Sequence, residues 1–245
     1  MWLFTFSLNL AQKTFNIPTR YNCTYSQRDV LRGLTFISLQ TAYAEGGLKN
    51  LTKRLRRANN KPEKQAQKRR HAPNSDTLLL RLKQINRPKT KNMLTKLNQQ
   101  VLTAAKTKGA FKKKVTVAID LTFIPYYGKK HTQWVVGGKP KKGTSYFHCW
   151  ATLRIVSLGR RFTIKACPVK KDELDAESIA KIVLELLAEA KTCGVPIDLV
   201  LLDKGFCWRE VIAALKTSGY KFLVAAKRDK PVKEAILDYF KTGKG

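Results

Sequence analysis

The chain has 245 residues, which is enough for one large domain or two small ones. Its 48 lysines and arginines outnumber its 17 acidic residues and give a formal net charge of +31, while 43% of its residues are hydrophobic. The hydrophobic fraction excludes a disordered basic tail. The charge argues against an ordinary metabolic enzyme and predicts a polyanionic partner, most commonly nucleic acid.

The cysteines and the N-terminal segment indicate in which cellular compartment the protein is found. The five cysteines are widely spaced and include no CxxC pair, so a structural zinc site is not expected and a reducing cytosol is favoured. The apolar stretch over residues 1–12 is interrupted by Thr5, Ser7 and Asn9 and is too short to cross a bilayer. We therefore expect a cytoplasmic protein without membrane segments, in which this stretch packs as a strand or helix.

Charge divides the chain into two predicted domains. Residues 1–114 hold 25 basic and 4 acidic residues, net +21, and residues 115–245 hold the remaining 23 and 13, net +10. The first part has helical spacing. Ser26 and Asp29 predict a capping box at the start of a helix that ends at Gly46-Gly47, and a further helix begins at Ser75 or Asp76. Residues 1–114 are thus predicted to form a helical, basic, DNA-binding region.

A basic run over residues 48–70 carries ten Lys and Arg against one acid, Glu63. A solvated helix face is one interpretation, but such a run repels itself without a polyanion, so we expect contacts to DNA phosphates. A second basic segment lies in the Gly- and Lys-rich loop over residues 128–145. The predicted DNA-contacting residues of the two segments are Lys53, Arg54, Arg56, Arg57, Lys68, Arg69, Arg70, Lys139, Lys141 and Lys142.

The second part, residues 115–245, changes to a strand period. Strands are predicted at 115–127, 146–156, 160–169, 197–203 and 220–226, and helices at 179–190 and 208–215. This order is typical of an α/β fold with a mixed sheet. Trp134, Tyr146 and Trp150 have two interpretations, stacking on unpaired bases or packing in the core, and His148 is expected to be structural.

Two aspartates stand at positions where burial is costly. Asp120 interrupts an apolar strand, and Asp203 ends another. Taken singly, Asp203 is a candidate helix N-cap and Asp120 a candidate exposed edge residue. If their strands are parallel neighbours, however, the two carboxylates converge at the carboxyl end of the sheet, where a divalent cation would relieve their repulsion. A basic protein with such a site indicates phosphoryl transfer on nucleic acid.

The segments AIDLTFIPYYGK, KKGTSYFHCWATLRIV, GRRFTIKACPV and LLDKGFCWREVIAAL resemble prokaryotic insertion-sequence transposases, which are DDE enzymes with an RNase H-like catalytic core. The similarity covers Val115 to Ala226, and the region Asp76–Ala105 fits more loosely. The resemblance implies that Asp120 and Asp203 are catalytic and bind Mg²⁺ or Mn²⁺ in a two-metal site. It also implies cleavage of element ends and their transfer to target DNA.

The resemblance also implies which partners the protein binds and shows where this sequence departs from the family pattern. Double-stranded DNA at terminal repeats and target sites, with a possible homodimer on paired ends, is the expected partner, and the nucleoid is the expected location. Lys204 and Arg209 flank Asp203 and would suit DNA near the metals. The family has a third acid, usually Glu, on a helix beyond the fifth strand. Here Glu234 is a weak candidate, so we expect a C-terminally truncated, incomplete RNase H-like domain.

Three other functions stay open from the sequence alone. A remnant without catalysis would act only as a DNA-binding protein at element ends. A structure-selective nuclease on the same fold, or a basic RNA-binding protein, would share the same charge.

Overall fold

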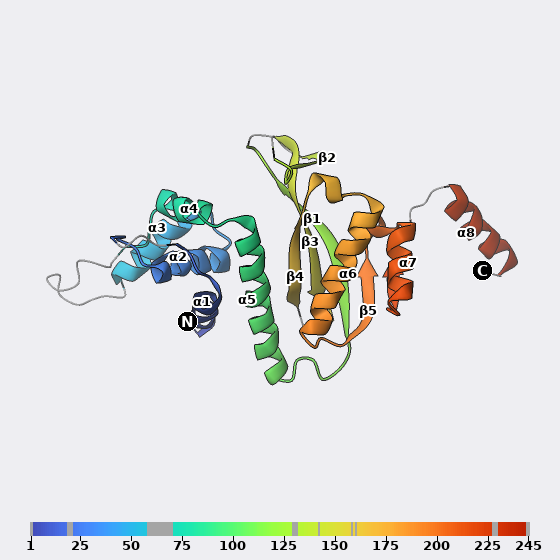
Figure 1. Cartoon of the computed structure of the whole chain (residues 1–245), viewed down its shortest axis with the longest axis horizontal. Coiled ribbons are helices and arrows are strands. Elements are labelled where there is room, and N and C mark those ends of the chain that lie inside the picture. The colour runs from blue at the N-terminus through green and yellow to red at the C-terminus, as the bar shows by residue number, and fades with distance from the viewer. Residues whose placement is uncertain are drawn as a thin grey trace. The chain divides into compact units, whose positions relative to one another are not determined.

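A computed structural model describes residues 2–18, 22–57, 71–128, 132–141, 143–157, 159, 161–226 and 230–243 (Figure 1). Contacts divide the chain into two compact units, Met1–Gln100 and Val101–Gly245. The boundary expected from charge, after residue 114, lies between the last helix before the sheet and the first strand. Among the described residues, none of the helices combines the length and the apolarity needed to cross a bilayer.

Unit 1 is helical. Its elements are α1 (Trp2–Thr14), α2 (Gln27–Gln40), α3 (Ala44–Arg57), α4 (Ser75–Lys83) and the first part of α5 (Arg87–Thr107). The N-terminal stretch is thus a helix. Its Leu8 joins a small core with Val30 and Leu31 of α2 and Leu48 and Leu51 of α3.

Helix α2 begins as predicted but ends earlier. The Ser26 hydroxyl accepts a hydrogen bond from the Asp29 amide, and the Asp29 carboxylate accepts one from the Ser26 amide, which completes the capping box. The helix ends at Thr41, whose φ of 48° is left-handed. The prediction that Gly46-Gly47 ends it is wrong, because both glycines lie inside α3. A Cβ at Gly47 would lie 2.9 Å from the Ile37 side chain, so this glycine lets α2 and α3 approach closely.

The start of α4 is shifted by one residue from the prediction. Asn74 is its N-cap, and the Asn74 side chain accepts a 2.7 Å hydrogen bond from the Thr77 amide. Ser75 and Asp76 follow as the first helical residues, so neither is the cap. Asn is as good an N-cap as Ser or Asp, and the sequence offers three adjacent candidates.

Unit 2 contains one six-stranded sheet. Its strands are β1 (Val115–Pro125), β2 (Val136–Lys141), β3 (Thr144–Ile155), β4 (Phe162–Val169), β5 (Ile197–Leu202) and β6 (Phe222–Val224). β1 pairs antiparallel with β3 on one side and parallel with β5 on the other; β3 also pairs with β2 and β4, and β5 pairs parallel with β6. The sheet is mixed, as predicted, and its order is RNase H-like. Strand β2 was expected as a loop.

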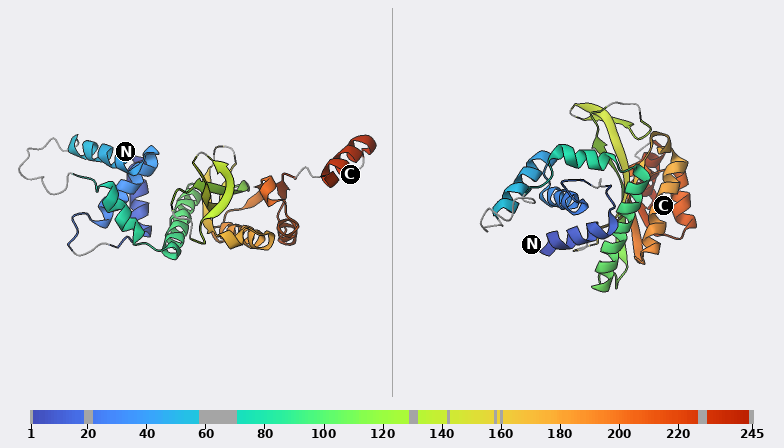
Figure 2. Two further views of the ribbon diagram at one scale, coloured as in Figure 1. Left: turned by 90° about the horizontal axis from the view of Figure 1, so that it is seen from above. Right: turned by 60° about the vertical axis from the view of Figure 1, so that its left-hand side comes forward.

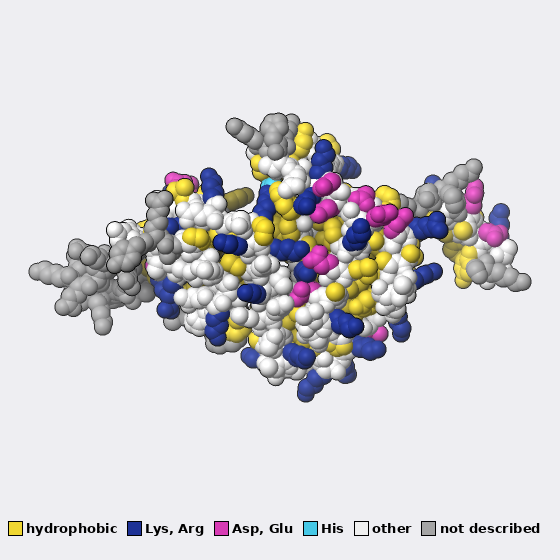
Figure 3. Space-filling model, viewed as in Figure 1, with side chains coloured by type: hydrophobic (Ala, Val, Ile, Leu, Met, Phe, Trp, Pro, Cys, Tyr) yellow, Lys and Arg dark blue, Asp and Glu magenta, His cyan; other side chains and the backbone are white. Residues whose placement is uncertain are grey.

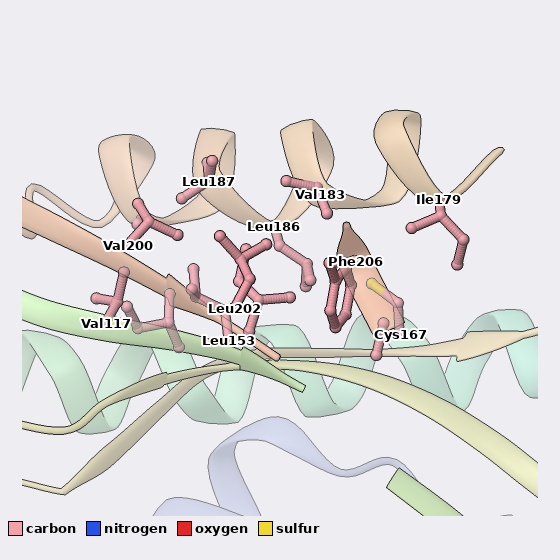
Figure 4. Packing of buried hydrophobic residues seen from close by; sticks show 14 of the residues in the cluster. Val117, Leu153, Cys167, Ile179, Val183, Leu186, Leu187, Val200, Leu202 and Phe206 are labelled. Atoms are coloured by element: carbon pink, nitrogen blue, oxygen red, sulfur yellow. The ribbon is translucent and has the colours of Figure 1, made fainter. Parts of the chain in front are cut away.

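Helices cover one face of this sheet. They are α6 (Ala176–Thr192) and α7 (Arg209–Thr217), and the short 3₁₀ turns η1 (Lys171–Glu173) and η2 (Lys204–Phe206) precede them. Both helices lie on the same side of the sheet (Figure 2). Figure 4 shows Ile179, Val183, Leu186 and Leu187 of α6 pointing toward strand residues such as Val117. The α/β fold with flanking helices is therefore confirmed. A last helix, α8 (Lys230–Thr242), follows β6.

The two faces of the sheet differ in burial. Along β1, Val115, Val117 and Ile119 are buried against the helices, whereas Thr116 and Ala118 on the other face are only half-buried and Asp120 is exposed. This alternation follows from the two-residue period of a strand. We call the less covered side the open face; it is the face on which Asp120 lies.

Candidate active site

Asp120 and Asp203 lie on neighbouring parallel strands. Ala118 pairs with Leu201 and Ile119 with Leu202 in the β1–β5 register. One further step of this register sets Asp120 opposite Asp203, which directly follows β5, at the strand separation of about 4.8 Å. Register partners in parallel strands point to the same face, so both carboxylates lie on the open face. Both are exposed.

Each carboxylate is oriented by one local hydrogen bond. The Thr122 hydroxyl, two residues along the same face of β1, donates to Asp120 Oδ2 at 3.2 Å. The Gly205 amide donates to Asp203 Oδ1 at 2.8 Å, so Asp203 caps η2. Asp203 is therefore both a helix N-cap, as predicted, and a residue of the candidate site. One oxygen of each carboxylate is engaged in this way, which leaves Asp120 Oδ1 and Asp203 Oδ2 to bind other groups.

The turn after β5 needs its glycine. A Cβ at Gly205 would lie 2.9 Å from Asp203 Oδ1, so a larger residue would push against the carboxylate that the amide holds. Phe206 anchors the turn, since its side chain is 1% exposed and belongs to the core of unit 2. The Trp208 indole N–H adds a 2.8 Å hydrogen bond to the Gly205 carbonyl. These contacts hold the turn that directly follows Asp203.

Asp120 is held in place by the pairing of β1 with β3. Asp120 pairs with Thr152 of β3, and the Thr152 hydroxyl reaches the Asp120 carbonyl at 3.5 Å. On the other face, burial raises the pKa of the Cys149 thiol to about 12, and the Asp120 charge adds to the rise. This thiol therefore stays protonated at neutral pH and is not available as a thiolate ligand.

The donor set at this site is two carboxylates. Hard carboxylate oxygens suit Mg²⁺ or Mn²⁺, and Mg²⁺ retains several waters, so one or two protein carboxylates plus substrate phosphates complete its shell. The residues present fit such an ion. Within the described part of the chain, no cluster of three or more His, Cys, Asp or Glu side chains forms a metal site. The weak third candidate, Glu234, lies exposed on α8.

The predicted DNA-contacting residues fall into separate groups. In unit 1, Lys53, Arg54, Arg56 and Arg57 are all exposed on α3, and the Arg54 guanidinium lies over the Phe36 ring at 5.2 Å from its centroid. In unit 2, Lys139 and Lys141 are exposed on β2, Lys204 is the first residue of η2, and Arg209 is the first residue of α7. Lys68, Arg69, Arg70 and Lys142 lie outside the described residues.

Acidic residues gather elsewhere in unit 2. On the face seen in Figure 3, they lie over η1 and α6, where Asp172, Glu173, Glu177 and Glu185 are found. That side carries helix α6, whereas Asp120 and Asp203 lie on the opposite side of the sheet. A polyanion is therefore disfavoured over α6.

Sequence reasoning missed two residues that orient the site. Thr122 shares the face of Asp120 through the two-residue strand period, and Gly205 stands two residues after a capping aspartate. Both signals are present in the sequence, as D-x-T in a strand and D-x-G after one. Neither pattern alone separates a functional site from ordinary local hydrogen bonding.

Comparison with known proteins gives weak structural likenesses. No family model matches the chain, and no curated protein matches it. The catalytic domain of Mos1 mariner transposase is 13% identical, with a TM-score of 0.33, over 66% of this chain and 85% of that one. The Mos1 mariner paired-end complex with Mn is 13% identical, with a TM-score of 0.33, over 95% of this chain and 76% of that one.

A third solved structure is the piggyBac transposase synaptic complex with hairpin DNA. It is 13% identical, with a TM-score of 0.42, over 94% of this chain and 49% of that one. All three similar structures are transposases. Since every TM-score is below 0.5, the fold assignment depends on the strand order and pairing described above.

Proposed function

We propose that this protein is a DDE-type transposase that cuts the ends of a prokaryotic insertion sequence and joins them to target DNA. The observation that carries the proposal is the β1–β5 register, which brings Asp120 and Asp203 together on one face. The sequence segments around both residues support it, and so does the net charge of +31, which suits a DNA substrate.

Asp120 and Asp203 would hold Mg²⁺ or Mn²⁺ through their unengaged oxygens. Ions held there, two of them as the resemblance implies, would supply a lower pKa for the attacking water or 3′-hydroxyl and stabilisation of the leaving oxygen. The protein contributes orientation. Thr122 and the Gly205 amide hold one oxygen of each carboxylate, and the paired strands keep both backbones in place.

DNA would be held by the basic groups around the site and in unit 1. Lys204 directly follows Asp203 and Arg209 begins the next helix, α7, and both would suit phosphates near the site. The α3 residues suit phosphates along a duplex, which fix register without reading bases. The proposed substrates are terminal repeats and target DNA, bound by a homodimer on paired ends at the bacterial nucleoid.

A second candidate function is binding to element ends without catalysis. It is favoured by the donor set, since the described residues supply two carboxylates at the site and no group of three. Such a protein would bind the same DNA and leave it uncut.

The test is nicking of end-containing DNA in Mn²⁺ by the full chain. Asp120→Asn and Asp203→Asn should each abolish nicking and leave DNA affinity equal or higher, because each removes one negative charge. Asp198→Asn is the matched control, since Asp198 is exposed near the opposite end of β5. Unchanged nicking in both site variants would refute the enzyme. Tight binding by the wild-type chain with no cleavage in any metal would establish the second candidate.

A further inference from the structure

The open face carries a row of side chains along β3 that is separate from the DNA-contacting residues predicted above. Asp120 pairs with Thr152, Thr122 with Trp150, and Ile124 with His148. Antiparallel partners share a face, so Trp150 and His148 lie on the same side as Asp120. Alternate residues of a strand are about 6.8 Å apart, so this row passes directly beside the candidate active site.

One end of the row is a basic pocket. Its volume is about 280 Å³, and it is lined by Arg154, Ile155, Val156, Arg161, Phe162 and Thr163. Arg154 lies two residues from Thr152 and pairs with Thr163 of β4. Both arginines are exposed, and within the described residues neither forms an ion pair. Two unpaired guanidinium groups and a hydroxyl around one hollow suit a phosphate.

The other end of the row is aromatic and rigid. The His148 ring lies 4.6 Å from the Tyr126 ring, and His148 Nδ1 donates to the Trp134 carbonyl at 3.0 Å. Trp150 is half-buried and lies between His148 and Thr152 in the row. Ile124, beside His148, is 48% exposed and extends the apolar surface. Flat, fixed, partly exposed rings suit the face of an unpaired base.

We propose that this row is a binding track for one unpaired DNA strand, with a phosphate in the Arg154–Arg161 pocket and a base stacked on Trp150. A duplex would not suit it, because paired bases present only their edges and stacking needs a free base face. The track passes Asp120, so it would place the reacting strand beside the candidate metal ligands. The inference deepens the proposed transposase function and depends on it for the identity of the substrate.

The test measures binding of a fluorescent single-stranded oligonucleotide and of the same sequence as a duplex, by anisotropy in EDTA so that no cleavage occurs. Arg154→Ala/Arg161→Ala should weaken single-strand binding and lower the magnitude of the slope of log K against log salt by about 0.7, which corresponds to the loss of one phosphate contact. Trp150→Ala should weaken single-strand binding by on the order of 10-fold, whereas Trp150→Phe should keep most of the wild-type affinity because it keeps an aromatic ring. Duplex affinity should change little in all of them.

Lys181→Ala/Lys191→Ala is the charge-matched control, because it also removes two positive charges and both lysines are exposed on α6, on the other side of the sheet. Thermal unfolding checks that each variant is folded, and the Phe variant separates stacking from packing. Equal weakening of duplex and single-strand binding, or no weakening of either, would overturn the track. Failure of Mn²⁺-dependent nicking with single-strand binding intact would instead count against the transposase and leave the track standing.

Discussion

The Lys165 ammonium on β4 lies 3.3 Å from the Glu189 carboxylate on α6, and both side chains are about nine-tenths buried, at 9% and 10% exposure. A second carboxylate, Glu185, lies 3.0 Å from the same ammonium and is 43% exposed. Lys165 pairs with Leu153 and therefore points to the helix side of the sheet. A charge in that position needs partners, and α6 supplies two of them one turn apart.

Removing the lysine should destabilise unit 2. Lys165→Met leaves the buried Glu189 without its partner, and we expect a loss of about 3 kcal/mol or more in the free energy of unfolding, measured by urea denaturation. Lys165→Met/Glu189→Gln should recover much of this loss, because no buried charge remains unpaired. Lys191→Met, at an exposed position on the same helix, should have little effect. Equal losses in the single and double variants would contradict the prediction.

Stability should also fall at alkaline pH. Burial disfavours the charged form of Lys165, but the hydrogen bond and charge of Glu185, with Cys167 and Glu189, raise the pKa of the ammonium above its ordinary value. A raised folded-state pKa gives stability that is complete below the unfolded value of about 10.4 and is lost as pH rises through the folded value.

The Cys149 and Cys193 thiols also lower the free energy of unfolding as pH rises, and their effect begins at a lower pH than that of Lys165. Burial raises the pKa of Cys149 to about 12 and that of Cys193 to about 11. The unfolded thiols ionise near pH 8.5, so the folded state binds more protons between that value and the folded pKa. The free energy of unfolding should therefore decrease steadily above about pH 8.5. Cys149→Ala should flatten this decrease when unfolding is followed by urea titration from pH 7 to 11; an unaltered profile would count against it.

The capping box of unit 1 should protect the start of α2. Ser26→Ala removes the acceptor for the Asp29 amide, at a cost of about 1 kcal/mol. Hydrogen exchange of the first-turn amides of α2 should then be about fivefold faster. Ser38→Ala is the control, because Ser38 is exposed within the same helix, where alanine is favourable. If exchange were faster in Ser38→Ala and unchanged in Ser26→Ala, the capping box would not be what protects the start of α2.

The salt dependence of duplex binding should identify the α3 contacts. Lys53→Ala/Arg57→Ala should reduce the slope of log K against log salt by about 1.8, or about 0.9 for each lost phosphate contact. Lys49 is the control on the same helix, since its ammonium already lies 2.7 Å from the Glu45 carboxylate. Lys49→Ala should therefore change the slope less. An unchanged slope in the double variant would remove α3 from the duplex interface.

The strands of the site could be predicted because their signals are local. The apolar runs around Asp120 and before Asp203 specify strands, whereas their parallel pairing was only a condition of the sequence argument and is seen in the β1–β5 register. The end of α2 could not be predicted in the same way. Gly46 and Gly47 read as a helix stop in the sequence, but Gly47 is required by the close contact with Ile37, which only tertiary packing reveals.

Strand β2 was missed for a related reason. Its residues include Gly137, Gly138 and Pro140, which have low strand propensity, and most of it is exposed. Pairing with Tyr146 and Phe147 of the long strand β3 decides its conformation. The arginine pocket was equally hidden, because Arg154 and Arg161 are brought together by the β3–β4 hairpin.

In unit 2 one side of the sheet is packed against helices, and the other side carries the candidate site. Residues such as Val117 and Leu202 are buried against the helices and can change little without loss of folding, whereas their neighbours Thr116 and Ala118 on the other side are only half-buried. Substrate preference can therefore drift, or be engineered, by substitutions at alternate positions of β1 and β3. The scaffold beneath them would tolerate such change without repacking.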